Sequence, residues 1–107
     1  MSVDARDKHG QTALMRAAQQ GNREAVETLI GAGADLNVTA KYTLTALMLA
    51  VVAGHEDIAR LLAGAGADLS IRGTGAPGFF GKTAADLAAA RGLADLANDL
   101  TPQSRKR

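Results

Sequence analysis

The stretch GQTALMRAAQQGNREAVETLIGAGADLN, residues 10–37, decides the fold because the chain repeats its pattern. Thirty-three residues further on, residues 43–70 read TLTALMLAVVAGHEDIARLLAGAGADLS. In this register Thr12 aligns with Thr45, and both copies contain the same six residues, GAGADL, at 31–36 and 64–69. Similarity at a fixed period of about 20 to 50 residues is the signature of a solenoid, in which like units stack.

A third copy, GKTAADLAAARGLADLANDL, begins at Gly81. Its threonine, Thr83, lies 38 residues after Thr45, so five residues are inserted ahead of this copy. The sequence therefore predicts one domain over residues 1–102, with repeats at about 7–39, 40–72 and 78–102, a lengthened loop at 72–82 and a basic tail at 103–107.

Each copy predicts a pair of short helices. A threonine precedes the first apolar run, where its hydroxyl is suited to cap a helix, at Thr12, Thr45 and Thr83. Asp86 follows Thr83 at the spacing of a capping box. A glycine then ends the first helix in a left-handed turn, at Gly21, Gly54 and Gly92. Neither helix of a pair can bury its apolar face alone, so the pairs must stack.

This pattern strongly resembles the ankyrin repeat over about residues 3–100. The matching motifs are Gly10-x-Thr12-Ala13-Leu14, Ala17-Ala18, Gly21 and Gly33-Ala34-Asp35 with Asn37, and then Thr45-Ala46-Leu47, Gly54-His55-Glu56 and Gly66-Ala67-Asp68. The resemblance implies an all-α solenoid of three antiparallel helix pairs, with β-hairpin fingers projecting at right angles. It also implies binding of other proteins on the concave face.

The chain departs from the family pattern at the start of each first helix. The family's Thr-Pro-Leu-His reads Thr-Ala-Leu-Met in the first two copies and Thr-Ala-Ala-Asp in the third. The histidine that braces the fingers in the family is therefore absent, and we expect Met15 and Met48 to fill those positions as apolar groups. His55, in the Gly-His position of the second copy, is expected to brace neighbouring loops.

Polar residues replace core residues in the outer copies, as the ends of a solenoid require. Arg16 stands where the second copy has Leu49, and Asp99 stands where it has Leu61. Residues 3–7, VDARD, read like the end of a preceding finger. We expect a short extended segment to begin the protein, in preference to a longer array that has been trimmed.

One motif suggests nucleotide binding. The segment Ala76-x-x-x-x-Gly81-Lys82-Thr83 is close to a phosphate-binding loop, whose glycines free backbone N–H groups for phosphate oxygens. However, Ala76 replaces the first glycine, and Gly81-x-Thr83 is already explained as the opening of the third repeat. Nucleotide binding is therefore a distant alternative.

Other chemistry finds little support. The chain has no cysteine, two histidines and no carboxylate pair beside an apolar pocket, because its acidic residues have turn or helix-start explanations. We therefore predict no enzyme activity, no metal site and no cofactor. A net charge of +1 argues against nucleic acid and membrane surfaces. We expect a cytoplasmic monomer, with a removed leader or secretion as an effector left open.

Alignment of the three copies on Thr12, Thr45 and Thr83, called the threonine register below, also predicts the binding surface. Residues three and one before each threonine point the same way in an extended segment, and residues seven and eight after it end the first helix beside the same concavity. The predicted partner-binding residues are His9, Gln11, Gln19, Gln20, Tyr42, Leu44, Val52, Phe79, Phe80, Lys82 and Arg91. Both phenylalanines have an open alternative, because either could pack on the last repeats instead. A regulatory or structural subunit docked permanently on an enzyme is the alternative function.

Overall fold

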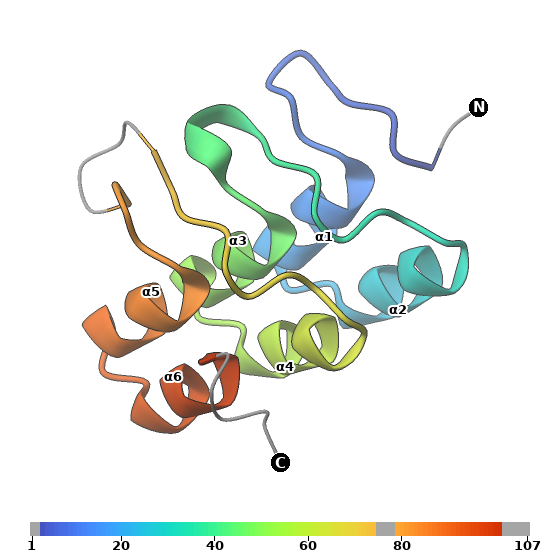
Figure 1. Ribbon diagram of the computed structural model, residues 1–107. Helices are drawn as coiled ribbons and strands as arrows, with labels where there is room; N and C mark the ends of the chain where they lie inside the picture. The colour runs from blue at the N-terminus through green and yellow to red at the C-terminus, as the bar shows by residue number, and fades with distance from the viewer. Residues whose placement is uncertain (1–2, 75–78, 102–107) are drawn as a thin grey trace.

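The computed structural model describes residues 3–74 and 79–101 as three stacked pairs of antiparallel helices (Figure 1). Helices α1, α3 and α5 form an inner row, and α2, α4 and α6 form an outer row. The bounds are α1 Ala13–Gln20, α2 Arg23–Gly31, α3 Ala46–Ala53, α4 Glu56–Gly64, α5 Ala84–Ala90 and α6 Ala94–Leu100, with a 3₁₀ turn, η1, at Lys41–Thr43. The predicted all-α solenoid is confirmed.

The inner helices begin and end as the sequence predicts. The hydroxyl of Thr12 accepts a hydrogen bond from the Met15 amide at 3.3 Å, and that of Thr45 accepts one from the Met48 amide at 3.2 Å. Thr83 and Asp86 form the complete capping box. Gly21 closes α1 at a φ of 79°, where glycine has no steric cost.

The core runs through the inner row and is thickest at the central unit. Helix α3 is buried on every side from Ala46 to Val51, because it packs between α1 and α5 and against α4. Met15 and Met48 are each 1% exposed, so these residues do fill their positions as apolar groups. Core side chains are small and aliphatic, which lets neighbouring units approach closely.

Equivalent hydrogen bonds in successive repeats link each turn that follows an outer helix to the segment before it. A carboxylate oxygen of Asp4 accepts from the Asp35 amide at 2.8 Å, and the side-chain oxygen of Asn37 accepts from the Asp68 amide at 2.7 Å. The two bonds repeat at the 33-residue period. Asp4 therefore bonds to the first repeat as Asn37 bonds to the second, so the segment at residues 3–7 occupies the position that the end of a preceding repeat would occupy.

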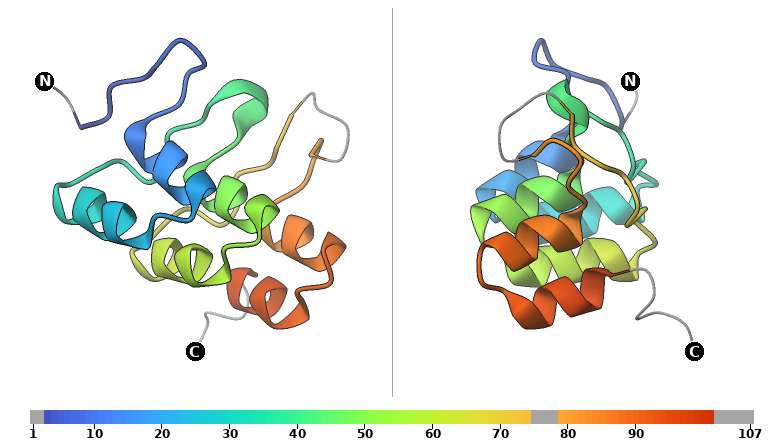
Figure 2. Two further views of the ribbon diagram at one scale, coloured as in Figure 1. Left: turned by 180° about the vertical axis from the view of Figure 1, so that it is seen from behind. Right: turned by 60° about the vertical axis from the view of Figure 1, so that its left-hand side comes forward.

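The loops that precede the inner helices are the segments that the sequence predicts to form β-hairpins. These loops, called fingers below, comprise residues 5–11, residues 38–44, and residues 71–74 with 79–82. They project together from one side of the helices (Figure 2). The described residues contain no β-strand, only an isolated bridge between Gly73 and Phe80. Backbone hydrogen bonds join the arms of the fingers: Ala40 N–H donates to Leu44 O at 2.8 Å in the second, and Gly73 N–H donates to Lys82 O at 2.9 Å in the third. The described parts of the fingers therefore do not confirm the predicted β-hairpins.

The outer units carry the polar substitutions on their exposed sides. Arg16 is exposed, whereas its counterpart Leu49 is 8% exposed. Asp99 is also exposed and accepts from the Arg60 guanidinium of α4 at 2.9 Å. Ala76 and the basic tail at 103–107 lie outside the described residues.

Candidate functional site

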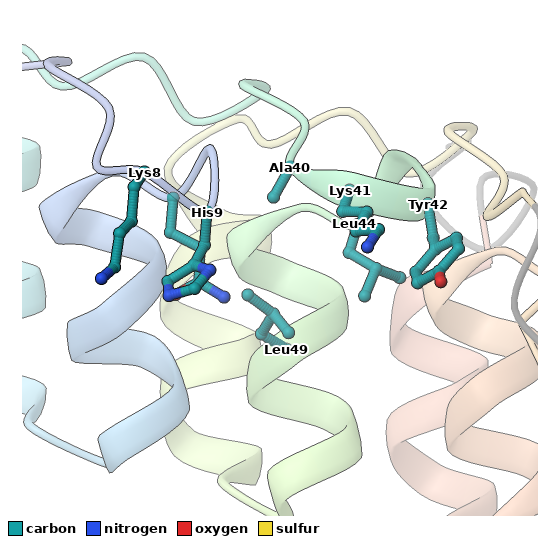
Figure 3. Close-up of a pocket in the computed structure, with 8 residues that line it drawn as sticks. Lys8, His9, Ala40, Lys41, Tyr42, Leu44 and Leu49 are labelled. Atoms are coloured by element: carbon teal, nitrogen blue, oxygen red, sulfur yellow. The ribbon is translucent and has the colours of Figure 1, made fainter.

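A cavity of about 560 Å³ opens between the first and second fingers, above the start of α3 (Figure 3). It is lined by Lys8, His9, Gln11, Ala40, Lys41, Tyr42, Leu44 and Leu49. Four of these residues, His9, Gln11, Tyr42 and Leu44, are among the predicted partner-binding residues. The threonine register therefore brings two pairs from adjacent repeats around one concavity.

The first finger is held in shape by Asp7. One carboxylate oxygen accepts from the amides of His9 at 2.8 Å and Gln11 at 3.0 Å. The other oxygen accepts from the Arg16 guanidinium at 3.0 Å. The Gln11 amide, followed by the other donors, lowers the pKa of Asp7 because each favours the ionised form. Asp7 thus positions the backbone that carries His9 and Gln11.

The second finger turns more sharply than an extended segment. Tyr42 and Thr43 have φ values of 64° and 61°, in the left-handed region that non-glycine residues seldom adopt. The predicted extended alternation of Tyr42 and Leu44 is therefore wrong, although both still line the cavity. Tyr42 O accepts from the Thr74 amide at 2.8 Å, and Thr43 Oγ1 lies 2.9 Å from Thr74 Oγ1. These bonds to the third finger hold the turn.

This turn also brings in residues that the threonine register missed. Lys41 lines the cavity beside Tyr42, with its Nζ atom 5.4 Å from the centre of the tyrosine ring. Lys8 lines the cavity from the first finger. An alternating strand would have turned these neighbours away from His9 and Tyr42. The signal in the sequence is that each lysine directly precedes a predicted partner-binding residue, His9 or Tyr42.

The third finger separates the two phenylalanines. Phe79 is half-buried and packs against the hydrophobic core, whereas Phe80 is 74% exposed. Gly73 is buried and lies against Phe79: a Cβ atom there would come within 2.5 Å of the Phe79 carbonyl oxygen. Phe79 therefore packs on the repeats, as the alternative interpretation holds. Phe80 and Lys82 are exposed, so a partner could contact both.

The predicted residues at the ends of the inner helices lie away from the cavity. Gln19, Gln20 and Arg91 are exposed and Val52 is half-buried, but none lines the cavity. The helices run away from the fingers, so seven residues at about 1.5 Å each separate the two regions by roughly 10 Å. Near this end, His55 Nε2 lies 3.2 Å from Gln19 O and joins the second repeat to the first, as expected of a bracing residue.

The described end of the phosphate-loop motif, Gly81-Lys82-Thr83, is engaged in the protein's own hydrogen bonds. The amides of Gly81 and Lys82 donate to Gly73 O and Phe79 O, each at 2.9 Å. The Thr83 amide donates to Asp86 at 3.0 Å, and its hydroxyl accepts from the Asp86 amide. The N–H groups of Gly81, Lys82 and Thr83 are therefore engaged in shaping the finger and capping α5.

Across residues 3–74 and 79–101, no three histidine, cysteine, aspartate or glutamate side chains gather in a way that could hold a metal ion. Over the same ranges, every helix is too short or too polar to cross a membrane.

The stacked helix pairs and their row of fingers define a helical-repeat solenoid with a concave, loop-bearing face. A family model described as ankyrin repeats (3 copies) matches residues 1–73. The chain therefore belongs to the ankyrin repeat family, whose members generally mediate protein–protein interaction and are typically not enzymes. Comparison with curated proteins gave no match.

Proposed function

We propose that this protein is a non-catalytic module that binds a protein partner through its fingers and the adjoining ends of its inner helices. The observation that carries the proposal is the cavity between the first two fingers, which four predicted contact residues line. Exposed Tyr42 and Phe80 lie on neighbouring fingers. Aromatic side chains beside an apolar centre are favoured in protein interfaces.

Tyr42 on the second finger is placed where a partner can contact it, and not in the core. Tyr42 is 42% exposed, although its left-handed backbone is held by the Thr74 bond. Strained backbone of this kind costs about 1–3 kcal/mol per residue and gathers at ligand-binding sites. The third finger thus maintains a conformation that displays Tyr42 beside the cavity.

A site-specific crosslinking experiment tests the proposal. A photoreactive phenylalanine analogue placed at Tyr42 should give a discrete protein adduct in the native host. The same analogue at Glu24, exposed on α2 in the outer row, is the matched control. Equal adducts from both positions, or none from Tyr42, would contradict the proposal.

The captured protein is then purified and its affinity measured against Tyr42→Gly. We expect Tyr42→Gly to weaken binding about tenfold or more, as loss of an interface aromatic does. We expect its stability to stay within about 1 kcal/mol of the wild type, because glycine relieves the left-handed strain while the exposed ring is lost. Unchanged affinity would place the interface elsewhere.

A further inference from the structure

Charge is divided between the two rows of helices. The outer helices carry six carboxylates and two guanidinium groups: Glu24, Glu27, Glu56, Asp57, Asp95 and Asp99, with Arg23 and Arg60. Both arginines form ion pairs within this row, Arg23 with Glu27 and Asp57, and Arg60 with Glu56 and Asp99. The outer face is therefore acidic in excess.

The finger side has the opposite character. Lys8, Lys41 and Lys82 are exposed, and no carboxylate forms an ion pair with them within the described residues. The carboxylates nearby are already engaged, since Asp7 pairs with Arg16 at 3.0 Å and Asp86 completes the capping box of α5. Lys82 also acts on the Asp86 carboxylate, so the cationic charge left for a partner to match is chiefly that of Lys8 and Lys41.

The cavity places two of these lysines around an apolar floor. Leu49 lies between His9 on the first finger and Lys41 on the second, and Leu44 lies beside Lys41 (Figure 3). Lys8 lines the cavity from the outer side of His9. Leu49 is buried beneath the opening and Leu44 is half-buried. A volume of about 560 Å³ falls within the range of roughly 300–1,000 Å³ typical of ligand sites. This space accommodates a bulky apolar side chain with its neighbouring residues.

We infer that the partner presents an acidic peptide segment that contains an apolar anchor residue. The anchor enters the cavity against Leu44 and Leu49, and carboxylates on either side meet the ammonium groups of Lys8 and Lys41. This inference rests on the proposed function and adds the chemistry of the partner to it. Charge complementarity of this kind steers association and rejects partners of the wrong sign.

A peptide matches the site better than a nucleic acid does. Phosphate backbones are bound by rows of cationic side chains along a continuous groove. Here the two lysines flank an aliphatic floor, which a phosphodiester cannot fill favourably. An apolar residue between carboxylates satisfies both parts of the site.

Selection from a displayed library of short random peptides tests the inference on the intact protein. We expect the enriched sequences to be acidic and to contain a central leucine, phenylalanine or similar residue. A double variant, Lys8→Glu with Lys41→Glu, should lose this enrichment. Enrichment of neutral or basic peptides, or no enrichment over the double variant, would overturn the inference.

An enriched peptide, labelled with a fluorophore, then gives quantitative affinities. Lys41→Glu should weaken binding about tenfold, and the wild-type affinity should fall as salt is raised. Arg23→Glu makes the same charge change on the outer face and should leave the affinity unaltered. Equal effects of the two reversals would contradict a site at the fingers, and melting curves for each variant identify any that fail to fold.

Two further measurements separate the competing occupants. Stronger binding of a single-stranded oligonucleotide than of the peptide would overturn the inference in favour of nucleic acid. Self-association that Lys8→Glu abolishes would overturn it in favour of a second copy, whose acidic outer helices would be the ligand. A partner crosslinked at Tyr42 that binds independently of both lysines would sustain the proposed function and refute this inference alone.

Discussion

At the scale of the residue, the close contact between Gly73 and Phe79 decides how the third finger folds. We expect Gly73→Ala to destabilise the protein by about 1–3 kcal/mol, because the added Cβ atom would overlap backbone and force the finger to move. The Phe79 carbonyl oxygen would lie only 2.5 Å from it. Chemical denaturation of the purified variant measures the loss.

Gly64→Ala is the matched control for this substitution. Gly64 ends α4, and a Cβ atom there would meet nothing within 4 Å. Alanine has the higher helix propensity, so this variant should be as stable as the wild type or up to about 1 kcal/mol more stable. Equal behaviour of the two variants would show that the Phe79 contact does not hold the finger.

At the scale of the element, the capping box of α5 makes stability depend on pH. The Thr83 amide, donating to the carboxylate at 3.0 Å, is the main cause that lowers the pKa of Asp86 from its ordinary value of 3.8. A depressed pKa in the folded state contributes stability above the unfolded value. This contribution is lost as the pH falls below about 4 and passes through the folded pKa.

We therefore expect Asp86→Asn to reduce the fall in melting temperature between neutral pH and pH of about 3. Some acid sensitivity should remain, because the Gln11 amide and the Ser70 hydroxyl lower the pKa values of Asp7 and Asp68 in the same way. Thr83→Ala should cost about 1 kcal/mol at neutral pH, and Thr83→Ser should restore most of it. An acid transition unchanged by Asp86→Asn would refute this account.

At the scale of the whole molecule, stability passes from one unit to the next. Helix α6 packs on α4 and α5, whereas α3 contacts both neighbouring inner helices and α4. Leu96 in α6 and Leu47 in α3 are both almost fully buried. Replacement of either by alanine should cost about 2–5 kcal/mol.

The two losses should spread differently in hydrogen exchange. We expect Leu96→Ala to accelerate amide exchange in α5 and α6 while α1 and α2 keep most of their protection. Leu47→Ala should accelerate exchange in all three units, because the central repeat supports both interfaces. Uniform acceleration by Leu96→Ala would instead indicate a single cooperative unit.

Much of this fold was predictable because its signals are local and repeat. A threonine hydroxyl reaches an amide three residues on, and a glycine ends the helix at a left-handed φ, so both act within one turn. The cavity was predictable only in part. His9, Gln11, Tyr42 and Leu44 meet there as the register predicts, but the same register assumed extended fingers and so missed Lys8 and Lys41.

The sequence by itself thus determined the helix pairs, their caps, their order and the apolar faces that stack them, because these depend on period and on bonds between near neighbours. Only the tertiary structure decided the fingers. Bonds from Thr74 hold Tyr42 and Thr43 in a turn that neither residue favours alone, and Gly73 admits the Phe79 backbone. These contacts join residues about 30 and six positions apart, and their energies outweigh local preference.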